Sequence, residues 1–339
     1  MKHQCLYLTG PKTLKICEVQ NFEQYNELLP EEVLINVKAC GVCGTDIHLF
    51  SGDISRTKYP VIPGHEVVGV IEAIGEKVPR HFSNKHVIID PIITCGKCVC
   101  CKSDKKNLCP NLLVIGIDTD GGFASLLKVP VLQVEILPDY IGDFEGCLIE
   151  PLAVSLNIID LLDISNCDHN AIIIGGGPLG LLTAQVLKSI YNFRVMVVEP
   201  SSYRRNICKE IDIEAISPNE AFRLSKDKKF DRIVEVAGEE SAVSLSINLA
   251  KLKGRIIVAG YHINKALIDV SAINQKQLKI IGSRSFKKSD LLTAIQLARK
   301  PSLKLPKLVN PIVPLNELEE IILSQKRVEE TVKIVVVPY

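Results

Sequence analysis

A glycine-rich turn near the middle of the chain is the feature that most constrains its fold. Residues 171–174 are an apolar run typical of a buried strand, and residues 181–190 are expected to form a helix. Between them, Gly175, Gly177 and Gly180 fill the pattern G-x-G-x-x-G, which permits a tight turn, close approach of a pyrophosphate and close packing of helix on strand. The pattern predicts a dinucleotide-binding turn in a parallel α/β sheet, with a ligand-free glycine turn as the alternative.

The residues after this turn favour the nucleotide interpretation. A second apolar strand over residues 195–198 ends in Glu199, nineteen positions after Gly180, where an acidic side chain would hold the hydroxyls of the adenosine ribose. Because strands and helices continue to alternate, we expect a six-stranded, doubly wound parallel sheet. Further strands are expected at residues 231–236, 255–259 and 278–281, with a helix at residues 241–252.

The first part of the chain predicts a different architecture. Short runs of β-forming residues alternate with turns rich in glycine, proline and asparagine, which is typical of an irregular β domain. We expect its strands at residues 14–19, 32–39, 67–74 and 86–90. The last elements that we expect are helices at residues 289–298 and 315–324 and a strand at residues 331–337, and this tail is expected to return to the first domain.

One group of polar residues in the β domain predicts a metal site. Cys43 and His65 are ligand types that suit a zinc site assembled by folding. Thr45 and His48 follow Cys43 by two and five positions, where they can carry a proton from a bound substrate to solvent. Glu150, expected at a helix start among apolar residues, is a candidate third ligand. Taken singly, each residue is more often a packed core side chain or a helix N-terminal charge, and it is their combination that favours a metal.

A second group of cysteines predicts a separate metal site. The spacing C-x2-C-x2-C-x7-C, formed by Cys95, Cys98, Cys101 and Cys109, is typical of a closed, tetrahedral structural zinc site. An iron–sulfur cluster also takes four thiolates, and a disulfide knot is a further alternative. Cys100 is a fifth thiol that can replace a neighbour, which leaves the ligand register open.

Composition excludes several classes of partner. The 40 basic and 39 acidic residues leave no excess charge, so we expect neither nucleic acid nor a membrane surface but a small-molecule ligand. The first residues show no signal peptide, and the longest uncharged run, residues 171–187, is too short and too rich in glycine for a membrane span. Twelve cysteines without an export signal favour a reducing, cytoplasmic compartment in which thiols bind metals.

The order of these motifs resembles the zinc-dependent medium-chain alcohol/polyol dehydrogenase family over essentially the whole chain. The motifs that carry the resemblance are residues 41–48 (GVCGTDIH), 64–66 (GHE), 120–123 (DGGF) and 175–180, together with the four-cysteine lobe. The resemblance implies a GroES-like β catalytic domain over residues 1–152 and 290–339, with the structural zinc lobe at residues 95–109. It also implies a Rossmann NAD-binding domain over residues 153–289, and a homodimer or homotetramer.

The resemblance also implies roles for single residues. Cys43, His65 and a glutamate would hold a catalytic zinc, while Thr45 and His48 would form the proton relay. Both Glu66 and Glu150 are candidates for the glutamate; since two carboxylates would make the site net negative, we expect one at a time to bind directly. We expect Glu66 to do so, with Glu150 reaching the metal through water and contacting substrate. The implied NAD contacts are Gly175, Gly177, Leu179, Gly180, Glu199, Arg204, Val258, Gly260, Ser283 and Arg284.

The implied reaction is NAD-dependent oxidation of a secondary alcohol to a ketone. Glu150 stands where the ethanol-type enzymes carry a cysteine, which makes the chain similar to the sorbitol, threonine and sugar-acid dehydrogenases. Residues 282–284 (GSR) look most like the branch that acts on hexonates. An L-threonine or simple alcohol dehydrogenase is the alternative among enzymes, and an NADH-sensing zinc-binding protein is the alternative outside them.

Overall fold

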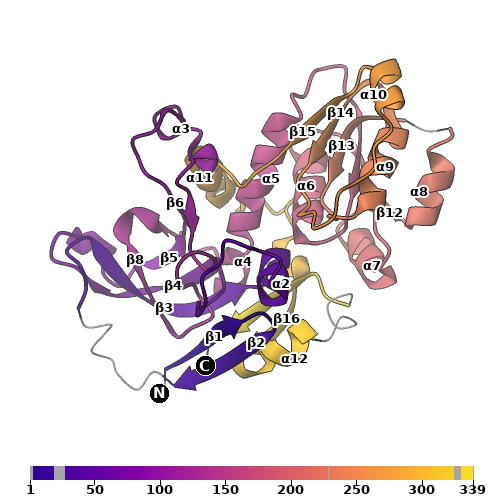
Figure 1. Ribbon diagram of the computed structural model, residues 1–339. Helices are drawn as coiled ribbons and strands as arrows, with labels where there is room; N and C mark the ends of the chain where they lie inside the picture. The colour runs from indigo at the N-terminus through magenta and orange to yellow at the C-terminus, as the bar shows by residue number, and fades with distance from the viewer. Residues whose placement is uncertain (1–2, 19–26, 228, 324–329, 339) are drawn as a thin grey trace. The chain divides into compact units, whose positions relative to one another are not determined.

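The computed structural model describes residues 3–18, 27–227, 229–323 and 330–338, and the chain divides into two compact units (Figure 1). The first unit consists of Met1–Glu150, Val309–Val328 and Lys333–Tyr339, and the second of Pro151–Leu308 and Glu329–Val332. The sequence placed the return to the first domain at residue 290, whereas helix α11 (Lys288–Leu297) still belongs to the second unit. The chain returns to the first unit at the start of strand β16 (Val309–Pro314), directly after the proline-containing turn Leu305–Leu308. This turn was not identified as a domain boundary from the sequence.

The second unit is built on a six-stranded parallel sheet, which confirms the doubly wound fold expected from the sequence. Its strands are apolar on both faces, with Ile172, Val197 and Ile256 fully buried, as is usual for a sheet covered on both sides. The strand order reverses direction between β10 and β13, where a dinucleotide binds in such sheets. In spatial order the strands are β12 (Glu214–Ile216), β11 (Arg194–Val198), β10 (Asn170–Ile174), β13 (Phe230–Glu235), β14 (Ala250–Val258) and β15 (Lys279–Gly282).

Helices connect these strands. The helix expected over residues 241–252 ends at Leu249, because Ala250 already pairs with Phe230 and begins β14. Helix α6 begins with Pro178, a residue well suited to a first helical position, and buries most of its length. The helices of this part of the chain are α5 (Ile149–Leu161), α6 (Pro178–Ser189), α7 (Ser202–Glu210), α8 (Pro218–Leu224), α9 (Glu240–Leu249), α10 (Val270–Lys276) and α11, with the short turn η4 (Leu305–Leu308).

The first unit contains a mostly antiparallel, seven-stranded sheet that includes the strands expected at residues 32–39, 67–74, 86–90 and 331–337, whereas the strand expected at residues 14–19 is β2 and pairs with β1 in a separate sheet. Its order is β16, β17 (Lys333–Val337), β3 (Glu32–Gly41), β4 (Glu66–Ile74), β5 (His86–Ile89) and β9 (Val134–Ile136), with β8 (Leu126–Pro130) also paired to β3. The last strand pairs with β3 at Val335–Gly41 and Val336–Cys40. This pairing brings the C-terminal residues next to the motif that begins at Gly41.

The remaining elements of the first unit are short. The strand expected over residues 14–19 and the helix expected over residues 315–324 each extend by one residue beyond the described part of the chain, and that helix is divided into a 3₁₀ turn and α12. The short elements are β1 (Gln4–Gly10), β2 (Thr13–Glu18), α2 (Gly44–Ser51), η1 (Arg80–Phe82), β6 (Ile92–Ile93), α3 (Val99–Lys102), η2 (Lys106–Leu108), β7 (Leu113–Val114), η3 (Val131–Gln133), α4 (Asp143–Gly146), η5 (Leu315–Glu317) and α12 (Leu318–Leu323).

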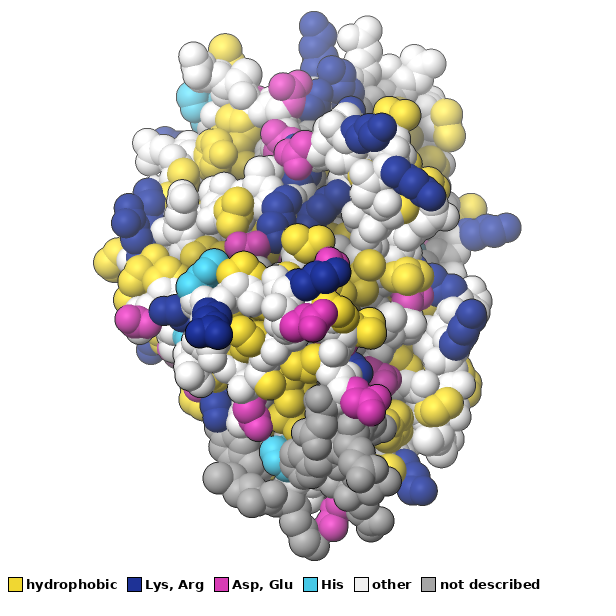
Figure 2. All heavy atoms as spheres, turned by 90° about the vertical axis from the view of Figure 1, so that its left-hand side faces the viewer, with side chains coloured by type: hydrophobic (Ala, Val, Ile, Leu, Met, Phe, Trp, Pro, Cys, Tyr) yellow, Lys and Arg dark blue, Asp and Glu magenta, His cyan; other side chains and the backbone are white. Residues whose placement is uncertain are grey.

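The surface shows no grouping of charge on the face drawn in Figure 2. There, outside the grey atoms, basic and acidic side chains lie interspersed among apolar ones. Among the helices that the structure describes, none has the length and apolar character needed to cross a membrane.

Candidate functional site

Three potential metal ligands converge at the start of α2 and β4. The ligand atoms of Cys43, His65 and Glu66 all lie within 4.8 Å of one another. Cys43 is the N-cap of α2, and His65 and Glu66 lead into β4, with only 6% and 2% of their surfaces exposed. A thiolate, an imidazole and a carboxylate in one buried place form a donor set that suits Zn²⁺.

Asp46 links two of these ligands, and its role was not predicted from the sequence. Its Oδ2 accepts a hydrogen bond from the backbone N–H of Cys43 at 2.8 Å, and its Oδ1 lies 3.7 Å from Nδ1 of His65. Neither Asp46 Oδ1 nor His65 Nδ1 has a hydrogen-bond partner within the described part of the chain. A hydrogen bond from His65 Nδ1 to this carboxylate would orient the ring and leave Nε2 for a metal.

The electrostatics of the group favour a cation. Burial alone would lower the pKa of His65, but the Asp46 carboxylate and the Cys43 thiol raise it well above its usual value. For the Asp46 carboxyl group, burial raises the pKa, and His65 lowers it by a smaller amount. Positive charge is therefore stabilised at this place, as a site for Zn²⁺ requires.

A buried lysine holds Glu66 from the other side. Lys333 on β17 is 1% exposed, and its Nζ lies 2.6 and 2.7 Å from the two carboxylate oxygens of Glu66 and 2.9 Å from the carbonyl oxygen of Val42. Gly41 makes room for this carboxylate, because a Cβ there would lie 2.0 Å from Glu66 Oε2. Glu66 thus lies between candidate metal ligands and a fixed positive charge. The sequence contains no local signal for this pair, since its members are 267 positions apart.

Glu150 is the second residue of α5 and is half-buried. Burial raises its pKa to about 7, with His65 lowering it and Glu66 raising it further. The charges of His65 and Glu66 therefore influence this carboxyl group. In the described part of the chain, however, the compact ligand group consists of Cys43, His65 and Glu66 without Glu150.

Helix α2 also positions the two proposed relay residues. Thr45 Oγ1 lies 3.6 Å from Cys43 Sγ, which places its hydroxyl beside the ligand group. His48 is one turn further along, with its side chain 26% exposed and its Nδ1 3.1 Å from Asp53 Oδ2. One residue therefore faces the ligands and the other reaches solvent.

The loop at residues 116–123 fixes the backbone that leads to His65. The N–H groups of Gly122 and Phe123 donate to the carbonyl oxygens of Gly64 and Pro63 at 2.8 and 3.0 Å. A Cβ on Gly121 would lie 2.2 Å from the Gly64 oxygen, so only glycine allows this contact. The loop therefore contributes backbone positioning rather than ligands.

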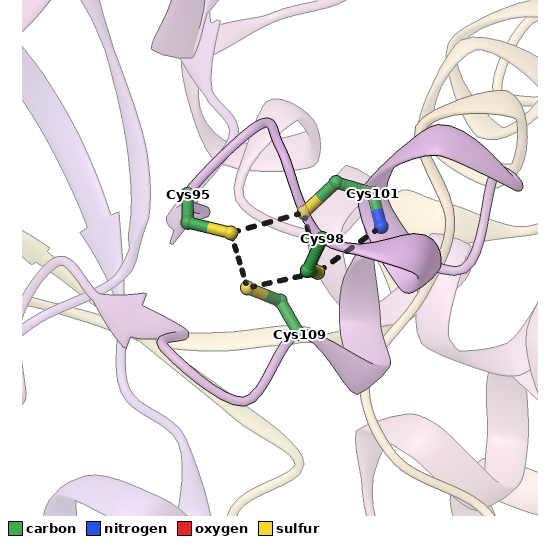
Figure 3. A group of neighbouring side chains, drawn as sticks. All are labelled: Cys95, Cys98, Cys101 and Cys109. Carbon is green, nitrogen blue, oxygen red and sulfur yellow. Dashed lines mark hydrogen bonds between the residues drawn. The ribbon is translucent and has the colours of Figure 1, made fainter.

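The four cysteines of the lobe form a compact tetrad (Figure 3). Their Sγ–Sγ separations are 3.9 Å for Cys95–Cys101, 3.4 Å for Cys98–Cys101, 3.9 Å for Cys98–Cys109 and 3.6 Å for Cys109–Cys95. A tetrahedral zinc with Zn–S bonds of about 2.3 Å needs sulfurs about 3.8 Å apart, so the tetrad fits this metal. Backbone N–H groups of Lys97 and Cys98 lower the pKa of Cys95 to about 6, which favours its thiolate. Among the described residues, the compact group of four thiols does not include Cys100.

The glycine turn of the second unit has the geometry expected of a nucleotide-binding turn. Gly175 has φ +114°, and a Cβ on Gly180 would lie 1.9 Å from the Gly175 oxygen, so both positions require glycine. Gly177 is the N-cap of α6, and nothing lies within 4 Å of a Cβ placed there. The N-terminus of α6 is thus open to an anionic group such as a pyrophosphate. Leu179 is the second residue of this helix.

Glu199 lies at the carboxyl end of β11 and is 3% exposed. Its Oε2 accepts from the N–H of Gly176 at 2.7 Å and its Oε1 from the N–H of Ser201 at 2.8 Å. Arg204 lies beside it, with NH1 3.9 Å from Glu199 Oε2 and Nε bonded to the Thr331 oxygen at 2.7 Å. A surface hollow of about 600 Å³ adjoins this segment and is lined by Pro200, Ser201, Ser202, Tyr203, Asn206 and Glu330.

The other proposed cofactor contacts lie at the carboxyl ends of β14 and β15. Val258 ends β14, and its carbonyl oxygen accepts from the N–H of Ser283 at 2.8 Å. The Ser283 hydroxyl is 3.1 Å from Asn157 Nδ2, and Arg284 is exposed beside it. Together with the glycine turn, these loops place the predicted contacts along one edge of the sheet, as a dinucleotide site requires.

Comparison with known proteins identifies both parts of the chain. Residues 29–139 match the alcohol dehydrogenase GroES-like domain, and residues 178–300 match the zinc-binding dehydrogenase family, which confirms the expected fold class. A 2-dehydro-3-deoxy-L-galactonate 5-dehydrogenase from Pseudoalteromonas atlantica is 31% identical over 85% of this chain and 86% of its own length.

Two solved structures resemble the whole chain. The alcohol dehydrogenase RspB from E. coli, bound to NADH, has a TM-score of 0.87 and 28% identity and covers 99% of this chain and 100% of its own. A putative zinc-binding dehydrogenase from Sinorhizobium meliloti, bound to NADP, has a TM-score of 0.90 and 27% identity over 100% of both chains.

Proposed function

Because the chain belongs to the zinc-binding dehydrogenase family, we propose that it oxidises a secondary alcohol of a polyol or sugar acid to a ketone with NAD. The observation that carries the proposal is the convergence of Cys43, His65 and Glu66 within 4.8 Å, in a chain whose other unit has a nucleotide-binding glycine turn. The similarity to an L-galactonate-derivative dehydrogenase supports a hexonate-like substrate.

The residues fit zinc and NAD, and each has a part in the proposed reaction. When bound, zinc supplies a Lewis acid that lowers the pKa of a substrate hydroxyl, and NAD accepts the hydride from the carbinol carbon. Cys43, His65 and Glu66 would hold the metal, Glu150 would contact the substrate, and Asp46 would orient His65. The Thr45 hydroxyl receives the hydroxyl proton of the alcohol, and His48 passes it to water. The alcohol thus loses one hydride and one proton and becomes a ketone.

The direct experiment is to follow NADH formation with a panel of substrates. We expect turnover with hexonates or polyols, and much lower kcat/KM with L-threonine and simple alcohols. Preference for L-threonine or ethanol would favour the alternative dehydrogenases. NADH binding without turnover of any alcohol would instead favour an NADH-sensing protein, in which the proton path through Thr45 and His48 would have no purpose.

We expect two zinc ions per chain with separate roles. Cys95→Ser is expected to remove one zinc and lower Tm by at least about 5 °C, because binding of a structural metal stabilises the folded lobe. Cys100→Ser is the matched control: it should keep both ions and the wild-type Tm, since Cys100 lies outside the tetrad. Elemental analysis and thermal denaturation measure both effects. A wild-type chain that contains iron, or a single zinc, would contradict the assignment.

We expect NAD to be preferred over NADP by about 10²-fold in kcat/KM, because a carboxylate facing a 2′-phosphate costs several kcal/mol. Arg204 is engaged with Glu199 and the Thr331 oxygen, so it is poorly placed to bind a phosphate. Glu199→Gln should narrow the preference, whereas Glu214→Gln on the exposed start of β12 should not. Equal efficiency of wild-type protein with both cofactors would refute the expectation.

The proposal extends to assembly and location. A homodimer or homotetramer is the assembly that the family resemblance implies, and light scattering measures it. None of the twelve cysteines, which all lie in the described part of the chain, forms a disulfide, which supports a reducing, cytoplasmic compartment.

A further inference from the structure

A buried glutamate at the end of β13 binds the two loops on either side of it. Glu235 is the last residue of the strand and is 0% exposed. Its Oε1 accepts hydrogen bonds from the N–H groups of Ala237 and Gly238, both at 2.8 Å. Its backbone oxygen accepts from Ala259 and Gly260, at 2.8 and 3.1 Å. One residue therefore fixes the loop after β13 and the loop after β14.

His262 completes the set of partners. Its Nε2 lies 2.9 Å from the other carboxylate oxygen of Glu235, and its side chain is 19% exposed. A buried carboxylate is costly unless its oxygens are bonded, so His262 compensates for the desolvation of Oε2. Neither residue belongs to the site predicted from the sequence, because Glu235 ends β13 and His262 lies 27 positions later, in the loop after β14.

These loops are in backbone contact with each other and with the glycine turn. A Cβ on Gly260 would lie 2.3 Å from the Gly238 nitrogen and 2.9 Å from Glu235 Oε2. A Cβ on Gly175 would lie 3.0 Å from the Ala237 nitrogen. The two loops therefore pack closely against each other, and the loop after β13 also packs against the glycine turn.

The strand order identifies which half of the cofactor these loops meet. Glu199 directly follows β11, on one side of β10, and marks the adenosine half. Strands β13 and β14 lie on the other side of β10. Because the dinucleotide crosses the switch point, the loops after β13 and β14 lie where the nicotinamide half binds.

We propose that Glu235 and His262 form a positioning pair that holds these two loops in the shape that binds the nicotinamide half of NAD. The inference rests on the proposed function and adds to it two residues that act through the loops rather than on substrate. The carboxylate fixes the loop after β13 through its N–H groups. The imidazole fixes the loop after β14 through the same carboxylate.

The experiment compares NADH with ADP-ribose, which lacks the nicotinamide, by calorimetric titration of the full chain. His262→Ala should weaken NADH binding about tenfold, or about 1.4 kcal/mol, and leave ADP-ribose within about twofold of wild type. KM for NAD should rise more than kcat falls. His262→Gln should restore most of the affinity, because the glutamine amide can donate to Glu235 Oε2.

A matched control is His86→Ala. His86 makes a similar contact in the first unit, with Nε2 2.8 Å from Asp143 Oδ1, so its loss tests for a general effect of removing such a pair. It should leave NADH affinity unchanged. Equal weakening of NADH and ADP-ribose by His262→Ala, or wild-type affinity for both, would overturn the inference. If wild-type protein binds neither ligand, the proposed function fails and the inference with it.

Discussion

Replacing Glu150 with glutamine is expected to lower kcat about 10³-fold while two zinc ions per chain remain, because acid–base groups contribute about 10²–10⁴-fold. Burial raises the pKa of Glu150 to about 7, with further effects from the charges of His65 and Glu66, so its carboxyl group can exchange a proton near neutral pH. Glutamine keeps the shape of the side chain but neither takes up nor releases this proton. Steady-state kinetics and elemental analysis of the same preparation measure the two effects.

The companion variant Glu66→Gln separates the two carboxylates. It should lower the zinc content towards one ion per chain, because an amide is a poorer zinc ligand than a carboxylate. Glu319 is an exposed residue in the first turn of α12, so Glu319→Gln is the control for removal of a helix-start charge and should leave kcat unchanged. A wild-type kcat in Glu150→Gln would show that Glu150 serves only as a negative charge at the start of a helix. Loss of zinc in Glu150→Gln, with zinc retained in Glu66→Gln, would show that Glu150 and not Glu66 is the direct zinc ligand.

Much of the fold follows from local patterns. The apolar runs at β10 and β11 and the glycines between β10 and α6 predict a parallel sheet, since both are local properties of the chain. The end of α9 was misplaced because pairing of Ala250 with Phe230, a contact between distant residues, decides where β14 begins. The limit of the second unit was also misplaced, because α11 belongs to that unit and no local motif marks this.

The candidate site also has parts that could be predicted from the sequence and parts that could not. Cys43, Thr45 and His48 are close in sequence, so they could be grouped from the sequence, but helix α2, which positions them, was not expected. Asp46 belongs to the same motif but shows its role only when His65 is placed beside it. Lys333 could not be predicted, because the pairing of β17 with β3 is what brings it to Glu66. The sequence shows a lysine at the start of an otherwise apolar strand but no feature that identifies its partner.

Lys333→Met is expected to lower the free energy of unfolding by about 3–5 kcal/mol, since removal of one member of a buried ion pair leaves the other charge uncompensated. Burial alone would lower the pKa of Lys333, but Glu66 raises it, so the lysine is charged and its loss leaves a carboxylate with 1% of its side chain exposed. Chemical denaturation measures the change. Lys307→Met, which removes an exposed pair with Glu210, should cost at most about 1 kcal/mol.

The double variant Glu66→Gln with Lys333→Met shows whether the loss arises from the pair. It should recover part of the stability lost in Lys333→Met, because no unpaired charge remains buried. If both single variants and the double variant are equally destabilised, the cause is the packing of the lysine chain in β17 and not its charge. The affinity of Lys333→Met for the zinc proposed at Cys43, His65 and Glu66 is then compared with that of wild type. Tighter binding in the variant would show that the lysine competes with the metal for Glu66, as its two contacts of 2.6 and 2.7 Å predict.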